Sequence, residues 1–221
     1  MGKLIVIEGA CDGIGKSTQT RLLRERLEKE GKVVSHHFPS YGAPQAKDVE
    51  KYLAGDYGTP GQLDPKVVNG FYAHDRDVTW KNELEPEYNN GSTILLDRYT
   101  TSSLIYQSAL MKTEEEKKEF IDFVVDYEYS KLGIGKPDTV IFLYADFDLA
   151  MKLKSERERM TNTTGDIHER DLDFMRKVYN NAMFIADYLN WSKVKCDDGD
   201  HMRPIEDIHE DVYKLVKKMD K

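Results

Sequence analysis

The feature that most constrains the fold is a glycine-bearing loop that joins an apolar segment to a helical one near the N-terminus. The apolar run Leu4–Ile7 is typical of a buried strand, and the loop closes on Gly15-Lys16-Ser17-Thr18 before an amphipathic helical pattern begins. In this context backbone N–H groups and a helix N-terminus converge on an anion. An ordinary glycine turn with a surface lysine is the alternative, which the flanking strand and helix disfavour. The segment predicts a site for a nucleoside triphosphate.

The loop assigns roles to its residues but has an irregular spacing. We expect Lys16 to reach the outer phosphates and the Ser17 hydroxyl to ligate Mg²⁺. Ala10 occupies the usual place of the first glycine, and Gly9 stands one position earlier. Either the loop is one residue longer than usual, or Ala10 replaces the glycine. The residues expected to bind ATP are Ala10, Cys11, Asp12, Gly13, Ile14, Gly15, Lys16, Ser17 and Thr18.

Composition narrows the function classes. A length of 221 residues without internal repeats predicts one domain over residues 1–221. The net charge of −8 argues against a nucleic-acid partner. No apolar run approaches the ~20 residues of a membrane helix, and no signal peptide is recognisable, so we expect a cytoplasmic protein without a membrane partner. Two cysteines are too few for a disulfide framework. Near the basic loop residues the pKa of Cys11 could be lowered, although a small residue filling a tight loop is the simpler interpretation.

The rest of the chain alternates apolar strand patterns with helical ones. We expect strands at 4–7, 33–34, 93–96, 139–144 and 193–196, and helices over 44–53, 65–85, 114–132, 149–159, 172–189 and 208–216. Residues 160–167 carry no periodicity and are expected to form a mobile loop. Alternation of this kind predicts an α/β fold with a parallel sheet, whose ligands bind beyond the carboxyl ends of the strands. The phosphate loop, Phe38-Pro39 and Asp97-Arg98 should therefore meet at one rim.

Asp97-Arg98 follows a buried apolar strand directly. A carboxylate there can hold a metal-bound water, and the adjacent guanidinium can bridge donor and acceptor phosphates. The alternative is an ion pair at a strand end with no ligand, which is less attractive beside a phosphate loop.

Two further groups of residues fit either a functional or a structural role. Tyr72 and Arg76 are four residues apart on a helical pattern, so they share a face on which a base could stack and bond, or on which they simply pack against the core. Arg157 and Arg159 end a helix beside the irregular loop. They either bring positive charge onto the transferring phosphoryl group as parts of a lid, or are only solvated, while Lys152 and Lys154 are expected at the surface.

Taken together, these motifs resemble the thymidylate kinase family over essentially the whole chain. The resemblance is carried by Glu8–Thr18, Phe38–Gly42, Tyr72–Arg76, Asp97–Tyr99 with Ser102, Ser103, Tyr106 and Gln107 after it, and Asp166–Asp171. It implies a phosphate-loop NTPase-like architecture with a five-stranded parallel sheet flanked by helices, as in nucleoside monophosphate kinases. It also implies phosphoryl transfer from ATP to dTMP with Mg²⁺, and a homodimer.

The resemblance also implies a role for individual residues. Tyr72 would stack on the thymine, Arg76 would bond a base carbonyl, and Ser103 with Gln107 would face the base edge. Tyr106 would crowd the sugar 2′ position, and Asp12 would take the 3′-hydroxyl or a Mg²⁺-bound water. Phe38, Pro39 and Tyr41 would line the acceptor pocket, Arg98 would hold the acceptor phosphate, and Glu169 would approach from beyond the lid. Catalysis would rest on Lys16, Asp97, Arg98, Arg157 and Arg159, with Ser17 and Asp97 at the metal.

Three features depart from the family pattern or select a branch of it. Gly13 stands where some members have an arginine, so this chain is similar to the bacterial kind that supplies arginines from the lid. Ser40 stands where many members contact the acceptor phosphate with an arginine, which leaves that role to Arg98, Lys47 or another cation. Tyr72 replaces the usual phenylalanine. The nearest alternative is a kinase for another monophosphate or a deoxynucleoside. A nucleotide-dependent switch is a second alternative, but the chain lacks an Asn-Lys-x-Asp motif. A third is an inactive structural relative, against which intact Lys16, Ser17, Asp97 and Arg98 argue.

Overall fold

The centre of the fold is a parallel sheet. The computed structural model describes residues 1–161, 167–168 and 171–219, apart from the side chains of residues 157, 158 and 161. Its five strands lie in the order β2-β3-β1-β4-β5, and every neighbouring pair is parallel. The strands are β1 (Lys3–Gly9), β2 (Val33–His37), β3 (Thr93–Asp97), β4 (Thr139–Tyr144) and β5 (Ser192–Lys195). The predicted α/β class and five-stranded sheet are confirmed.

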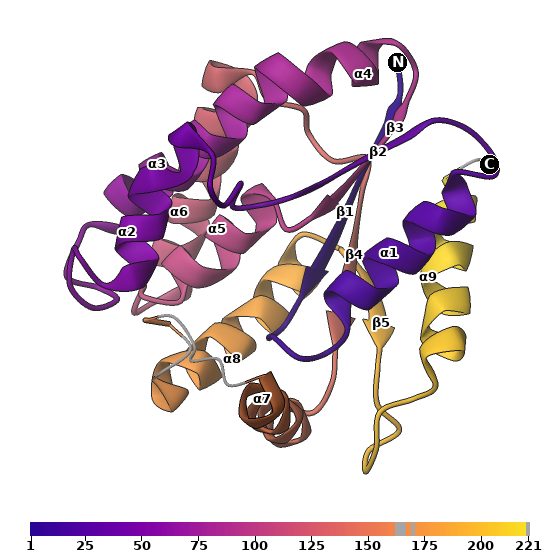
Figure 1. Cartoon of the computed structure of the whole chain (residues 1–221). Helices are drawn as coiled ribbons and strands as arrows, with labels where there is room; N and C mark the ends of the chain where they lie inside the picture. Colours follow the sequence, from indigo (N-terminus) through magenta and orange to yellow (C-terminus); the bar gives the residue numbers. More distant parts are fainter. Residues whose placement is uncertain (162–166, 169–170, 220–221) are drawn as a thin grey trace.

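Helices cover both faces of the sheet because the strands are apolar on both sides. In β1, Ile5 and Ile7 pack against α1 (Lys16–Leu27) and α9 (Ile205–Lys218), whereas Leu4 and Val6 face the opposite layer. That layer contains α5 (Thr100–Ser108), α6 (Glu114–Val125) and α8 (Leu172–Tyr188) (Figure 1). None of the helices described is long and apolar enough to span a membrane.

Two of the long predicted helices contain π-helical segments. The stretch expected over 65–85 is α3 (Pro65–Thr79), the π-helical η2 (Trp80–Leu84) and α4 (Glu85–Asn89). The stretch expected over 114–132 is α6 followed by the π-helical η3 (Asp126–Leu132). Wider turns of this type are common at functional sites, and hydrophobic periodicity does not reveal them.

The remaining elements differ from expectation mainly at their ends. Residues 44–53 form the 3₁₀ turn η1 (Pro44–Ala46) and α2 (Lys47–Ala54). Helix α7 (Phe147–Thr161) is longer than the predicted 149–159. The loop expected over 160–167 falls mainly outside the described residues. Its first two residues belong to α7, and Ile167 donates its N–H to the carbonyl of Leu53 at 3.3 Å.

Helix α5 was not predicted. It begins with Thr100-Thr101-Ser102-Ser103, and threonine and serine are weak helix formers in an isolated chain. Most of its residues are buried, so there is no polar face to create a period. Its stability therefore comes from tertiary contacts made by those hydroxyl groups, which are described below.

The close packing of Gly135 against Trp80 gives a test of this layer. A Cβ atom at Gly135 would lie 2.2 Å from Cη2 of the buried Trp80 ring, whereas a Cβ at Gly70 in α3 would meet nothing within 4 Å. We expect Gly135→Ala to lower the free energy of unfolding by about 1–3 kcal/mol through overpacking. Gly70→Ala, the matched control, should leave it unchanged or raise it by up to ~1 kcal/mol. Urea unfolding of both variants checks this, and equal stability of Gly135→Ala and the wild type would contradict it.

Candidate active site

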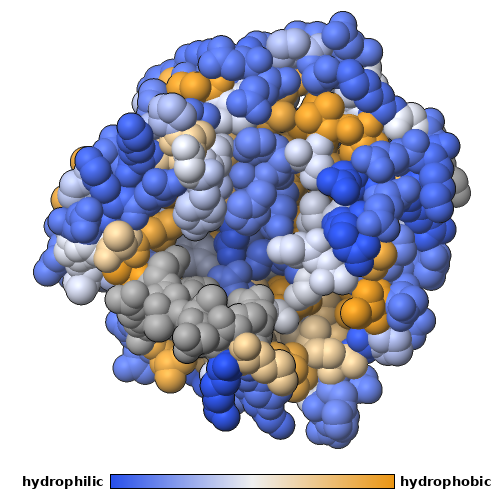
Figure 2. All heavy atoms as spheres, in the orientation of Figure 1, coloured by the Kyte–Doolittle hydropathy of each residue, from blue (hydrophilic) through white to orange (hydrophobic). Residues whose placement is uncertain are grey.

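The three segments expected to meet at the rim do meet there. Ile7 pairs with Asp97 across β1 and β3, His37 pairs with Asp97 across β2 and β3, and Arg98 donates its N–H to the carbonyl of Ile7 at 3.1 Å. A cleft of about 340 Å³ opens beyond these strand ends. Hydrophilic side chains lie around the hollow at the centre of this face (Figure 2). Its lining comprises Asp12, His37, Phe38, Pro39, Tyr41, Leu53, Tyr72, Asp75, Arg76, Arg98, Tyr99, Ser102, Ser103, Tyr106, Gln107 and His168.

The phosphate loop leads directly into α1, which begins at Lys16. Gly13 and Gly15 have φ angles of 88° and 94°, which only glycine adopts readily, so backbone N–H groups are available to an anion here. Ala10 donates its N–H to Leu143 and thus continues β1, while a Cβ at Gly9 would lie 2.7 Å from Cδ1 of Ile14. Gly9 is thus the last residue of β1, and Ala10 stands at the start of the loop.

Three loop side chains belong to the core. Ala10, Cys11 and Ile14 are buried among apolar residues, so a phosphate can reach only their backbone. Thr18 is half-buried, and the Ser17 side chain is exposed. The loop thus offers a phosphate its backbone, Lys16 and the hydroxyl of Ser17.

Asp12 connects the two principal cations of the cleft. Its Oδ1 accepts a hydrogen bond from Lys16 Nζ at 2.8 Å and another from Arg98 Nη2 at 2.5 Å. Burial lowers the pKa of Arg98, but the charges of Asp12 and Glu8 outweigh it and raise that pKa well above its ordinary value. Lys16 and Arg98 thus both contact a single carboxylate oxygen, which phosphates would displace or share.

Glu8 was not identified as a site residue by the sequence analysis. Its Oε1 lies 3.8 Å from Nη1 of Arg98. It is fully buried in β1, and it accepts hydrogen bonds from Thr101 Oγ1 at 2.8 Å and from Ser102 Oγ at 2.6 Å. Ser102 Oγ accepts in turn from Arg98 Nη1 at 3.4 Å, and Arg98 itself has a left-handed φ of 66°. The only signal in the sequence was an acidic residue at the end of an otherwise apolar strand.

The surroundings of Asp97 favour the negatively charged form of its side chain. Burial would raise its pKa, but a hydrogen bond from His37 and the charges of Lys16 and Arg98 lower it below its ordinary value. Its Oδ2 lies 3.2 Å from Ser17 Oγ and 3.3 Å from Nδ1 of His37, whereas its buried Oδ1 has no partner among the described residues. A hydroxyl and a carboxylate oxygen with spare acceptor capacity fit the hard oxygen ligation of Mg²⁺, which binds proteins through few side chains when phosphates supply the rest.

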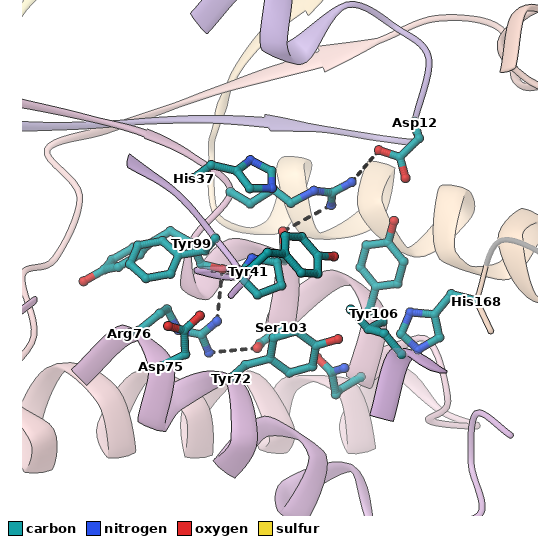
Figure 3. A pocket seen from close by; sticks show the side chains of 16 residues that line it. Asp12, His37, Tyr41, Tyr72, Asp75, Arg76, Tyr99, Ser103, Tyr106 and His168 are labelled. Carbon is teal, nitrogen blue, oxygen red and sulfur yellow. Dashed lines mark hydrogen bonds and ion pairs between the residues drawn. The ribbon is translucent and has the colours of Figure 1, made fainter. Parts of the chain in front are cut away.

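The far end of the cleft carries Tyr72 and Arg76, which share a face of α3 as expected (Figure 3). The Arg76 guanidinium is buried and forms a two-point ion pair with Glu128 of η3, with Nε–Oε2 and Nη2–Oε1 distances of 2.7 Å. Nη2 also donates to Ser103 Oγ at 2.9 Å. The sequence analysis did not identify Glu128, because nothing local distinguishes it from other acidic residues of a charged helix.

Aromatic and amide side chains also line the far end of the cleft. Gln107 is buried, and its Oε1 has no hydrogen-bond partner in the described part of the chain. The ring of Tyr106 stacks on His168 with a centroid distance of 5.2 Å, and the Arg98 guanidinium lies 5.7 Å from the centre of the Tyr106 ring. His168, the last residue of the predicted lid segment (about 157–168), also lies 3.1 Å from the hydroxyl of Tyr52 and was not among the predicted site residues.

The segment after β2 forms one wall. Phe38, Pro39 and Tyr41 line the cleft as expected, and the His37 ring stacks over Tyr41 at 6.3 Å. Ser40 turns away from the cleft. Its hydroxyl lies 2.9 Å from Nε2 of His36 and 3.2 Å from the Thr79 hydroxyl, and its N–H donates to Asp75 at 2.8 Å. Lys47 is exposed and outside the lining, whereas Arg98 lines the cleft.

The predicted lid residues are only partly described. Arg159 is exposed in the last turn of α7, while the side chain of Arg157 and all of Glu169 lie outside the described residues. The surface placement of Lys154 was wrong. This side chain is buried, and a Cβ at Gly13 would lie 3.5 Å from its Cβ, so α7 packs directly on the phosphate loop.

Comparisons with known proteins agree with this geometry. A family model for thymidylate kinase matches residues 7–212. A thymidylate kinase of Caldicellulosiruptor saccharolyticus is 29% identical, over 97% of this chain and 96% of the relative. A probable thymidylate kinase of Pyrobaculum aerophilum is 29% identical, over 97% and 96%. The solved structure of thymidylate kinase from Candida albicans has a similar fold, with a TM-score of 0.70 and 22% identity over 98% of this chain and 92% of that one.

The two cysteines test the burial of the phosphate loop. Burial raises the pKa of Cys11 to about 12 despite the charge of Lys16, and burial also raises that of Cys196 to about 12. The lowering considered for Cys11 is therefore wrong. We expect Ellman's reagent at pH 8 to react with neither thiol of the native protein within minutes and with both after unfolding in urea. Cys196→Ala would assign any native reaction, and labelling of Cys11 at the rate of a free thiol would contradict its burial.

Proposed function

Because the chain belongs to the thymidylate kinase family, it transfers a phosphoryl group from ATP to dTMP to give dTDP and ADP, and we propose which residues perform each part of that reaction. The observation that supports the assignment is the shared contact of Lys16 and Arg98 with Asp12. A cation of the triphosphate loop and a cation of the acceptor cleft are thereby held within reach of one atom. The γ-phosphate and the acceptor phosphate would meet there.

The donor side is assigned to the phosphate loop. The backbone of residues 10–18 and the N-terminus of α1 would bind the triphosphate, and Lys16 would leave Asp12 to contact the outer phosphates. Asp12 would then be available to the sugar 3′-hydroxyl of dTMP or to a bound water. Ser17 and Asp97 would hold Mg²⁺, which neutralises charge on the β- and γ-phosphates when it is bound.

The acceptor side is assigned to the cleft. Arg98 would hold the phosphate of dTMP so that one of its oxygens is in line with the γ-phosphorus, where the new P–O bond forms as the bond to the β-phosphate oxygen breaks. Tyr72 would stack on the thymine, and Tyr106 would close the sugar 2′ side. The base edge would face Arg76, Ser103 and Gln107, and the wall would be Phe38, Pro39 and Tyr41.

Three further assignments concern the lid, the oligomeric state and the compartment. Arg157, Arg159 and Glu169 would come from the lid region to the transferring group and the acceptor. A homodimer is supported by the face of α3, where Val67 is 50% exposed. A cytoplasmic compartment is supported by two free cysteines, which suit a reducing environment.

An acceptor panel tests the substrate. We expect ADP release from ATP to be fastest with dTMP, because the stacking ring, the guanidinium and the amide would bind a methylated base with carbonyl groups, and the phosphate would need Arg98. The panel compares dTMP with dUMP, dGMP and thymidine in a coupled assay. Equal kcat/KM for dTMP and dGMP, or a preference for thymidine, would contradict the assignment of the cleft.

Replacement of the two cations tests the phosphate roles. We expect Lys16→Ala and Arg98→Ala each to lower kcat about 100-fold or more, since each removes a preorganised charge from the transition state. Single-turnover rates measured with saturating nucleotides check this. Lys29→Ala, in the exposed turn after α1, is the matched control and should keep the wild-type rate. A near-normal single-turnover rate in either cleft variant would show that its cation has another role.

A further inference from the structure

The ion pair between Arg76 and Glu128 is one of the most completely buried features of the molecule. Both side chains are almost inaccessible to solvent, although Arg76 borders the cleft. Glu128 accepts two hydrogen bonds from Arg76 and one of 2.9 Å from the Thr100 hydroxyl. Removing one partner of a pair that is buried in this way leaves an uncompensated charge, so the two residues are interdependent.

The donors of Arg76 can be counted. A guanidinium has five N–H groups in a rigid plane. Two of them are bound by Glu128, one by Ser103 Oγ, and one on Nη1 by the carbonyl of Tyr99 at 3.4 Å. Among the described residues, one N–H on Nη1 is left without a partner and is available to the cleft. Glu128 binds the edge of the guanidinium formed by Nε and Nη2, away from Nη1. Because this contact has two points, the direction of the last donor is fixed before any nucleotide arrives.

From this geometry we infer that Glu128 is a positioning residue that sets base specificity through Arg76, although Glu128 does not line the cleft. The inference rests on the proposed function, in which Arg76 bonds the base. It adds the reason why an arginine serves there. The pair has no net charge, so the base end presents one oriented donor to a neutral ring instead of an open cation that would attract phosphate.

The chemistry that this donor recognises follows from its type. An N–H directed at the base edge requires an acceptor, such as the 4-carbonyl oxygen of thymine or uracil. It faces an unfavourable donor–donor contact with the 4-amino group of a cytosine base. A site built to hydrogen-bond a substrate group rejects an analogue lacking it far more strongly than a hydrophobic pocket rejects a change of size. Discrimination between these bases should therefore depend on how firmly Arg76 is held.

The π-helical form of η3 explains how Glu128 reaches this place. The segment Asp126–Leu132 extends α6 with a wider turn, and the carbonyl of Glu128 accepts the N–H of Ile134 where the helix ends. Thr100 approaches the same carboxylate from the start of α5. Glu128 is thus held by two elements besides α3, so its carboxylate is a fixed reference for the guanidinium.

Glu128→Gln tests the inference. Gln has the same size but places an amide NH₂ against donors of Arg76 or Thr100, so the guanidinium must move. We expect the KM for dTMP to rise about tenfold or more, kcat to change less than about threefold, and the preference in kcat/KM for dTMP over 5-methyl-dCMP to fall at least about tenfold. A loss of folded protein alone would lower apparent kcat for both acceptors and leave KM and that preference unchanged.

Three companion variants make the result decisive. Glu119→Gln, the matched control, makes the same change at an exposed position of α6 and should change KM less than about threefold. Glu128→Asp, which retains the charge but is too short for the two-point contact, should act like Glu128→Gln and replaces it if that variant does not fold. In an Arg76→Ala background, Glu128→Gln should have no further effect on the KM for dTMP.

The outcomes separate the two proposals. If Arg76→Ala raises the KM for dTMP while folded Glu128→Gln and Glu128→Asp keep the wild-type KM and base preference, the positioning role of Glu128 is overturned and the proposed function stands. If Arg76→Ala itself leaves the KM and the base preference unchanged, the assignment of Arg76 to the base fails, and the role of Glu128 fails with it. A further rise in KM when Glu128→Gln is added to Arg76→Ala would show that Glu128 acts by another route.

Discussion

The parallel pairing of β1 with β3 is the constraint on which the site depends. It places Ile7 opposite Asp97, so that the strand leading to the phosphate loop and the strand leading to Arg98 end at the same level of the sheet. The hydrogen bond from the N–H of Arg98 to the Ile7 carbonyl extends this pairing one residue beyond β3. A shift of register by one residue would turn the alternating side chains of the strand to the other face. Donor and acceptor groups would then no longer face one another.

Electrostatics explains how an acidic chain maintains a site for phosphates. The net charge is −8, yet Arg98 lines the cleft and Lys16 of the phosphate loop contacts the same Asp12 carboxylate. Each is held in place by carboxylates that are themselves shielded: Asp12 binds both cations, and Glu8 stands behind Arg98. The carboxylate of Asp12 between Lys16 and Arg98 orients both side chains in the free protein, and an arriving phosphate can exchange with it. The positive charge is local and preorganised, which is the arrangement that stabilises charge developing in a transition state.

Much of the fold, and many of the residues that come together around the cleft, could be predicted from the sequence because their signals are local. The apolar strands, the loop ending in Gly15-Lys16-Ser17 and the four-residue spacing of Tyr72 and Arg76 can each be recognised within a short window. Glu8, His37, Glu128 and His168 could not be found in this way, since each owes its place to partners distant in sequence. Glu128, for example, meets Arg76 from 52 positions away. Helix α5 was not predicted for the same reason, because its polar residues are buried by tertiary contacts that produce no local hydrophobic period.

Helix α5 joins the two ends of the cleft. Its first four residues donate hydroxyl groups to, or accept bonds in, both acid–arginine systems: Thr100 binds Glu128, Thr101 and Ser102 bind Glu8, Ser102 also accepts from Arg98, and Ser103 accepts from Arg76. Both carboxylates thereby lie at a helix N-terminus, where the macrodipole favours negative charge. One helical turn thus sets the relative positions of the guanidinium assigned to the base and the guanidinium assigned to the phosphate. A run of weak helix formers is retained there because each hydroxyl has a buried charged partner, so that the distance between the two arginines is a property of the scaffold.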